Sequence, residues 1–215
     1  MVIQFLSLTP ETIAQGVVEL ASQDKDLARI VEQFGHPPNW QCEPGFIGLI
    51  ETIVGQQVSV ASAKAIFKRL TTIVVPLTPE NLLAYDDLQL QAAGLSRQKI
   101  SYCRGLAQAI RGGKIDLDKL AIEDETTIRN ELKQIKGIGE WTVDTYLLMS
   151  LQRPDVFPKG DLGVIVGYQK LKNLPTRPTP KELEKIAEKW RPWRAIATRL
   201  LWHYYLSNQT KVRVN

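Results

Sequence analysis

Two helical patterns in this chain are separated by only three residues, Gly137-Ile138-Gly139. Apolar residues recur at helical spacing over 128–135 before them and over 143–151 after them. A connection this short fits only a tight hairpin, and its glycines permit positive φ and close approach of a ligand to the backbone. The hairpin would direct the free amides at the start of the second helix outward, where they favour an anion. A plain helix–turn–helix corner is the alternative, because glycine is common at helix C-termini.

Helical patterns cover almost the whole chain, so we expect an all-α fold. Thr9, Thr78 and Thr179 each precede a proline, and a hydroxyl N-cap followed by proline is a good helix start. Further helices are expected at about 46–54, 63–70 after a cap at Ser59, 97–111, 125–135, 140–151, 162–172, 180–189 and 193–206. Only residues 2–8 are expected to be extended.

The charge is distributed unevenly along the chain. Residues 1–50 carry a net charge of −4 and residues 51–215 a net charge of +8. The acidic start and the basic end can pair, so we expect a two-lobed helical bundle. One lobe would be discontinuous, combining 1–50 with about 166–215, and the other would be about 51–165 with the helix–hairpin–helix at about 125–151. Two acid-free basic stretches, 94–114 and 189–215, suit a polyanionic partner, although solvated helix faces would look the same.

Composition excludes several classes of protein. No run of 18 apolar residues occurs, and no basic residue precedes the first apolar stretch, so neither a membrane partner nor a secretion signal is expected. Cys42 and Cys103 are too few for a disulfide framework or a four-cysteine iron–sulfur cluster. We expect a monomer in a reducing compartment: cytoplasm or nucleoid in a bacterium, nucleus in a eukaryote.

Asp161 follows a proline-bearing loop and precedes a new apolar helix. At the N-cap, backbone amides and the helix dipole would stabilise its negative charge. An aspartate in this place can also do nothing more than cap the helix.

The hairpin segment Gly137–Thr142 together with the loop Asp155–Asp161 resembles the helix–hairpin–helix DNA glycosylases. Within that superfamily, both segments are similar to the DNA-3-methyladenine glycosylase II family. The runs Ile53–Ser59 and Arg191–Arg194 also resemble that family, and the likeness extends from about Phe46 to Tyr205. Longer members have an additional N-terminal domain that we expect to be missing or reduced here, which leaves the substrate range open.

The resemblance implies base excision repair on double-stranded DNA that contains damaged bases, with the active-site cleft between the lobes. Alkylated purines such as 3-methyladenine would be flipped out and hydrolysed off, leaving an abasic site. Asp161 would stabilise the oxocarbenium-like sugar and orient the attacking water. Superfamily members that also nick DNA carry a lysine two residues after the second hairpin glycine, where this chain has Trp141, so we expect a monofunctional enzyme. Lys159 leaves a weak lyase activity open.

The resemblance also implies the residues that contact DNA. Amides around Gly137, Gly139 and Trp141 would bind phosphates without reading sequence, with Lys133 and Lys136 beside them.

Other roles are implied with an open alternative for each residue. Gln57 and Val58 would form the wedge that fills the gap left by the flipped nucleotide, or simply a polar helix end. Trp141 is the best candidate for the base pocket; Tyr146 and Trp193 are weaker candidates that we expect to pack in the core.

No cofactor is expected to be required, and no iron–sulfur cluster. By family likeness, the carbonyls of Lys133, Ile135 and Gly137 would hold a monovalent cation, Na⁺ or K⁺. The competing hypotheses are a glycosylase for deaminated or oxidised bases and a non-catalytic DNA-binding module. Asp161 argues against the second, because a pure binder gains nothing from an anion near phosphates.

Overall fold

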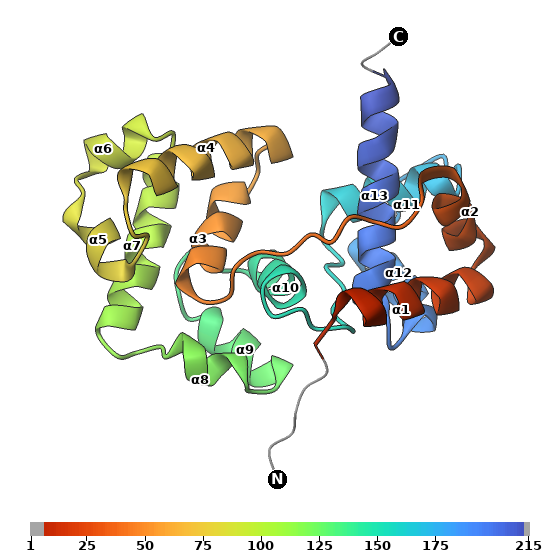
Figure 1. Ribbon diagram of the computed structural model, residues 1–215, viewed down its shortest axis with the longest axis horizontal. Helices are drawn as coiled ribbons and strands as arrows, with labels where there is room; N and C mark the ends of the chain where they lie inside the picture. The colour runs from red at the N-terminus through yellow and green to blue at the C-terminus, as the bar shows by residue number, and fades with distance from the viewer. Residues whose placement is uncertain (1–6, 213–215) are drawn as a thin grey trace. The chain divides into compact units, whose positions relative to one another are not determined.

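The computed structural model describes residues 7–212, with side chains through residue 209 (Figure 1). The described part contains α-helices and one short 3-10 helix but no strand, which confirms the all-α prediction. The segment expected to be extended, 2–8, falls almost wholly outside it. Within the described part, no helix combines the length and the apolar character needed to cross a membrane.

The chain divides into two compact units. The first, here called the hairpin unit, is Gln41–Leu151. Its helices are α3 (Phe46–Gly55), α4 (Val60–Ile73), α5 (Pro79–Ala84), α6 (Asp87–Ala92), α7 (Arg97–Arg111), α8 (Leu117–Ala121), α9 (Glu125–Leu132) and α10 (Glu140–Met149).

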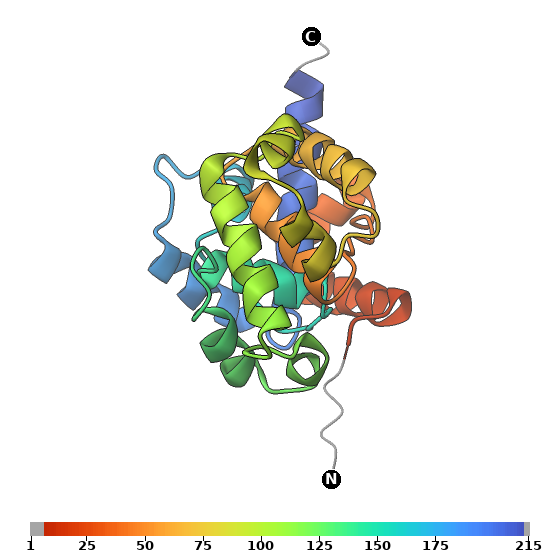
Figure 2. The same cartoon turned by 90° about the vertical axis from the view of Figure 1, so that its left-hand side faces the viewer.

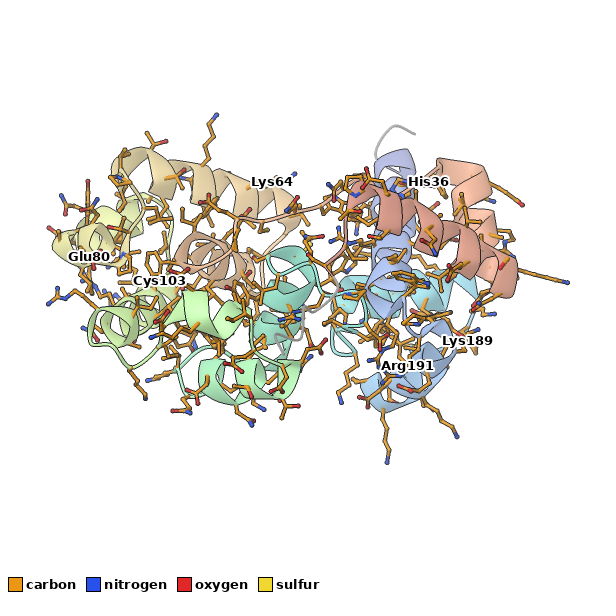
Figure 3. The ribbon with its side chains drawn as sticks, turned by 60° about the horizontal axis from the view of Figure 1, so that its bottom comes forward. His36, Lys64, Glu80, Cys103, Lys189 and Arg191 are labelled. Atoms are coloured by element: carbon orange, nitrogen blue, oxygen red, sulfur yellow. The ribbon has the colours of Figure 1, made fainter. Side chains whose placement is uncertain are left out.

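Helix α3 forms the core of the hairpin unit because it is apolar on all sides. Leu49, Ile50, Ile53 and Val54 are fully buried. Helices α4, α7 and α10 pack around it, and α7 also lies beside α5 (Figure 2). Cys103 of α7, labelled in Figure 3, is fully buried, and burial raises the pKa of its thiol to about 12. The hairpin is therefore built onto a rigid core through α10.

The second unit, here called the aspartate unit, contains residues 7–40 and 152–212 of the described part. Its core is α13, which packs against α1, α2 and α11. A Cβ added at Gly167 would lie 2.7 Å from the carbonyl oxygen of Leu201, so glycine at this position allows α11 and α13 to approach closely. The helices of this unit are α1 (Pro10–Gln23), α2 (Lys25–Phe34), α11 (Leu162–Leu171), α12 (Pro180–Ala187), the 3-10 helix η1 (Glu188–Trp190) and α13 (Arg194–Val212).

The unit boundaries differ from the expected ones at about 50 and 165. They lie after Trp40 and after Leu151. The physical reason is packing: α3 is the core helix of the hairpin unit and so cannot belong to the other, and α11 packs on α13.

The predicted helix starts are confirmed. The side chains of Thr9, Thr78 and Thr179 each accept a hydrogen bond from an amide three residues on, and Ser59 caps α4 in the same way. Helix α9 ends at Leu132 instead of 135 because the hairpin turn begins there. Helices α2, α6 and α8 were not predicted.

Candidate functional site

The hairpin between α9 and α10 has the predicted form. Gly137 has φ +92°, the left-handed region that favours glycine. Ile138 is buried, and its N–H donates to the Ile135 carbonyl at 3.0 Å. Gly139 is the N-cap of α10 and has no side chain to cap it, so the first amides of α10 are left for another acceptor.

Gly137 is also constrained by a neighbour that the sequence did not reveal. A Cβ at this position would lie 2.1 Å from the ring of Tyr102 in α7. The hydroxyl of Tyr102 is contacted by the Gln98 side-chain amide at 2.6 Å. Helix α7 therefore packs against the hairpin, and the space between the Tyr102 ring and the backbone at residue 137 admits only glycine.

An ion-pair cluster braces the two hairpin helices. Arg129 of α9 lies 2.6 Å from the nearly buried Asp144 and 3.3 Å from Glu140, both on α10. Lys133 pairs with the same Glu140, and its hydrogen bond helps hold the pKa of that carboxyl below the usual range. Lys136 is exposed and has no ion pair in the part of the chain that the structure describes. Of the two predicted hairpin lysines, Lys136 thus has the more available charge.

The loop between α3 and α4, residues 56–59, is here called the wedge loop. The Gln56 side-chain amide donates to the Gly137 carbonyl at 2.8 Å and to the Thr142 hydroxyl at 2.9 Å, so this loop lies against the hairpin. Gln57 and Val58 are exposed, and Gln57 has φ +54°, a strained backbone for a residue other than glycine. Their role as a wedge stays a prediction.

Asp161 is the N-cap of α11, as expected. Its Oδ1 accepts a hydrogen bond from the Val164 amide at 2.9 Å and a second from the indole N–H of Trp202 at 2.8 Å. The residue is 8% exposed. These donors and the dipole of α11 fix a negative group at one position near the surface of the aspartate unit.

Trp202 is a functional candidate that the sequence reasoning missed. It lies on α13, half-buried, and the ring of Trp40 packs edge-on against it with 6.2 Å between centroids. The Trp202 ring therefore lies beside Asp161, and Trp40 packs against Trp202. The signal in the sequence was weak, because 41 residues separate Asp161 from Trp202 and only the packing of α11 on α13 joins them.

Tyr146 and Trp193, the two weaker base-pocket candidates, are core residues, which confirms the expectation that they pack in the core and removes them from the base pocket. Tyr146 is 1% exposed, and its hydroxyl accepts the Gly45 N–H at 3.1 Å; burial raises the pKa of that hydroxyl. Trp193 is 8% exposed, and its indole N–H donates to Glu19. Trp141, in the first turn of α10, is partly exposed and remains a candidate for the base pocket.

The remaining predicted residues have these positions. Lys159 is paired with Glu184 at 2.7 Å. For the predicted cation, the carbonyls of Ile135 and Gly137 already accept one hydrogen bond each, from Ile138 and Gln56. A carbonyl oxygen has two lone pairs, so these groups keep one position for an ion, and the cation stays a prediction.

Comparison with known proteins identifies similar chains. The sequence matches the model of the HhH-GPD superfamily, base excision DNA repair protein, over residues 50–192. It is 34% identical over 200 residues to DNA-3-methyladenine glycosylase 1 of Schizosaccharomyces pombe, covering 89% of this chain and 87% of that protein. It is 32% identical over 153 residues to DNA-3-methyladenine glycosylase of Saccharomyces cerevisiae, covering 66% of this chain and 50% of that protein.

A solved structure is similar as well. The 3-methyladenine DNA glycosylase of S. pombe in complex with abasic DNA superposes with a TM-score of 0.83 at 33% identity, over 87% of this chain and 95% of that one.

Proposed function

Because the chain belongs to the HhH-GPD superfamily of base excision DNA repair proteins, we propose that it removes alkylated purines such as 3-methyladenine from DNA by hydrolysis. It is a DNA N-glycosylase, so its reaction breaks the bond between a base and its deoxyribose. As that bond breaks, positive charge develops on the sugar. An alkylated purine already carries positive charge and leaves without a general acid.

The observation that carries the proposal is the fixed carboxylate of Asp161. A preorganised anion stabilises an oxocarbenium-like sugar without any rearrangement at the moment of reaction. The Val164 amide and the Trp202 indole hold Oδ1 in place at 2.9 and 2.8 Å. Water is the nucleophile, oriented by this carboxylate, and the product is an abasic site.

The hairpin supplies the grip on DNA. Uncapped amides at the start of α10 and the exposed Lys136 suit a phosphate, and such contacts position DNA without reading its sequence. A monovalent cation on the carbonyls of Lys133, Ile135 and Gly137 would add positive charge near that phosphate. Gln57 and Val58 would fill the space of the flipped nucleotide.

Release of 3-methyladenine from methylated DNA by the purified protein is the direct test. Release that depends on protein concentration is expected. A protein that binds DNA but releases no base from it would be a non-catalytic binding module. Release of hypoxanthine or 8-oxoguanine in preference to methylated purines would show instead that the enzyme acts on deaminated or oxidised bases.

Substitutions of Trp202 are expected to reduce the rate of base release by an intermediate factor. Trp202→Phe keeps an aromatic ring but removes the donor to Asp161, so we expect the single-turnover rate on DNA with one alkylated purine to fall about 10-fold. Trp202→Ala also removes the ring face that attracts a cationic base, and a fall of about 100-fold is expected. Trp40→Phe keeps the edge contact and serves as the control. A Trp202→Phe variant as fast as wild type would exclude the indole N–H from the mechanism.

A second prediction concerns the nucleophile. Trp141 occupies the position of the lyase lysine, so no amine is expected to attack the sugar. Treating an active reaction mixture with borohydride should therefore trap no covalent protein–DNA adduct, and the DNA should remain unbroken until alkali is added. A trapped adduct would contradict the monofunctional mechanism. If wild type forms such an adduct and Lys159→Ala does not, the amine that attacks the sugar is that of Lys159.

A further inference from the structure

Lys99, in the first turn of α7, contacts the end of α3, which directly precedes the wedge loop. The Lys99 ammonium donates to the Val54 carbonyl at 2.7 Å. Val54 is fully buried in the last turn of α3, where helix carbonyls lack intrahelical partners and where the helix dipole favours a cation. Lys99 therefore fixes the end of α3, two residues before Gln56.

Both ends of the wedge loop are also fixed by hydrogen bonds. Gln56 donates to both the Gly137 carbonyl and the Thr142 hydroxyl, so the start of the loop is tied to the hairpin. The end of the loop is fixed by Ser59, whose hydroxyl accepts the Ser62 amide and begins α4.

The same face of α7 contacts the hairpin. Tyr102 lies one turn after Lys99, and its ring packs against Gly137. One helix thus contacts the hairpin through Tyr102 and, through Lys99, the end of α3 from which the wedge loop starts.

Gln57 is the residue on which this support acts. Its φ of +54° is uncommon for a residue other than glycine, and such a conformation persists only where its surroundings enforce it. Gln57 itself is exposed, so the enforcement comes from its anchored neighbours: Val54 held by Lys99, and Gln56 held by the hairpin.

We propose that Lys99 is a positioning residue for base extrusion, holding the end of α3 so that Gln57 is presented as a preformed wedge. This inference rests on the proposed function, because it requires a flipped nucleotide. Lys99 touches neither substrate nor reacting atoms in this role. Removing its donor leaves the hairpin grip on phosphates in place and loosens the wedge alone.

Lys99→Met tests the proposal. Loss of a charged donor to a buried carbonyl is expected to lower the single-turnover rate of base release about 10- to 100-fold, while the Kd for undamaged DNA changes less than about twofold. Lys99→Arg retains a donor and should recover most of the rate. Lys181→Met, which removes an exposed ammonium from α12, controls for the change in net charge.

A double-mutant cycle separates positioning from a general loss of structure. If Lys99 acts through the wedge, Lys99→Met should slow Gln57→Ala by less than about twofold, because the group it positions is already gone. Rates are measured below the thermal unfolding transition of each variant. Three outcomes would overturn the proposal. The first is that the rate losses of Lys99→Met and Gln57→Ala multiply fully in the double variant, and the second is that Gln57→Ala reacts at the wild-type rate. The third is that the Kd of Lys99→Met for undamaged DNA rises in step with its loss of rate. A wild-type protein that releases no base would overturn the proposed function instead.

Discussion

Asp161→Asn should release 3-methyladenine about 100- to 1,000-fold more slowly than wild type in single turnover, the usual cost of losing one preorganised electrostatic group. The substitution removes the negative charge and little else. Asparagine is as good an N-cap as aspartate, and its carbonyl oxygen can accept the same bonds from Val164 and Trp202. The Kd for undamaged DNA should stay within about threefold of wild type, because no phosphate contact is lost.

A matched control separates the charge from the cap. Asp86 is the N-cap of α6, where it forms a capping box with Gln89. Asp86→Asn changes the same chemical group in the same helix position and should leave the rate unchanged. Equal rates for Asp161→Asn and wild type would leave Asp161 as a cap alone. The fixed anion would then have to come from another carboxylate.

Local signals in the sequence predicted the hairpin and the position of Asp161. Gly137 and Gly139 lie between two helical periodicities, and a chain this short between helices has few ways to turn. Asp161 lies between a proline-bearing loop and an apolar helix, which is the pattern of an N-cap. In both cases the information is contained within a few consecutive residues, so the structure and the sequence agree.

Long-range contacts were not predictable from the sequence. The bond from Trp202 to Asp161 depends on how closely α11 and α13 pack, and the bond from Lys99 to Val54 spans 45 residues. Nothing in the spacing of these residues indicates either contact. Such pairs form only when helices that are each specified by their own sequence segment pack together in the core.

For a related reason, local sequence alone does not decide whether an aromatic residue lines a pocket or packs in the core. Tyr146 and Trp193 have the same local helical context whether they face a pocket or the core, and burial decides between the two. Helices α6 and α8 are six and five residues long, too short for a periodic pattern to be distinguished from a turn. The missed helix α2 did carry a signal, because Asp24 caps it and Leu27 and Ile30 share its buried face.

Gly137→Ala is expected to weaken binding to undamaged DNA about 10- to 100-fold, whatever the sequence of that DNA. Alanine at φ +92° is strained, and its Cβ would overlap the ring of Tyr102 at 2.1 Å. The hairpin must shift to relieve both, which moves the amides at the start of α10 away from the phosphate. We also expect the free energy of unfolding to fall by about 2–4 kcal/mol, from backbone strain and overpacking together. Fluorescence anisotropy and thermal melts measure the two effects.

Gly139→Ala distinguishes the shape of the hairpin from its contact surface. Nothing lies within 4 Å of a Cβ at Gly139, and its φ of −103° suits any residue, so this variant should fold, with a loss of stability of at most about 1 kcal/mol because alanine is a poorer N-cap than glycine. Its methyl group would then only crowd the phosphate, and a loss of affinity smaller than that of Gly137→Ala is expected. A folded Gly137→Ala variant with wild-type affinity would remove the hairpin from the DNA interface.

Tyr102→Ala separates the two causes of the destabilisation expected in Gly137→Ala. Removing the ring eliminates the overlap but leaves the positive φ, so the double variant with Gly137→Ala should regain about 1 kcal/mol relative to the sum of the single changes. If the two changes are additive, the backbone conformation of Gly137 alone sets the shape of the hairpin. If the double variant recovers both stability and affinity, contact with α7 is what requires glycine there. The hairpin would then depend on Tyr102, a residue 35 positions earlier in the chain.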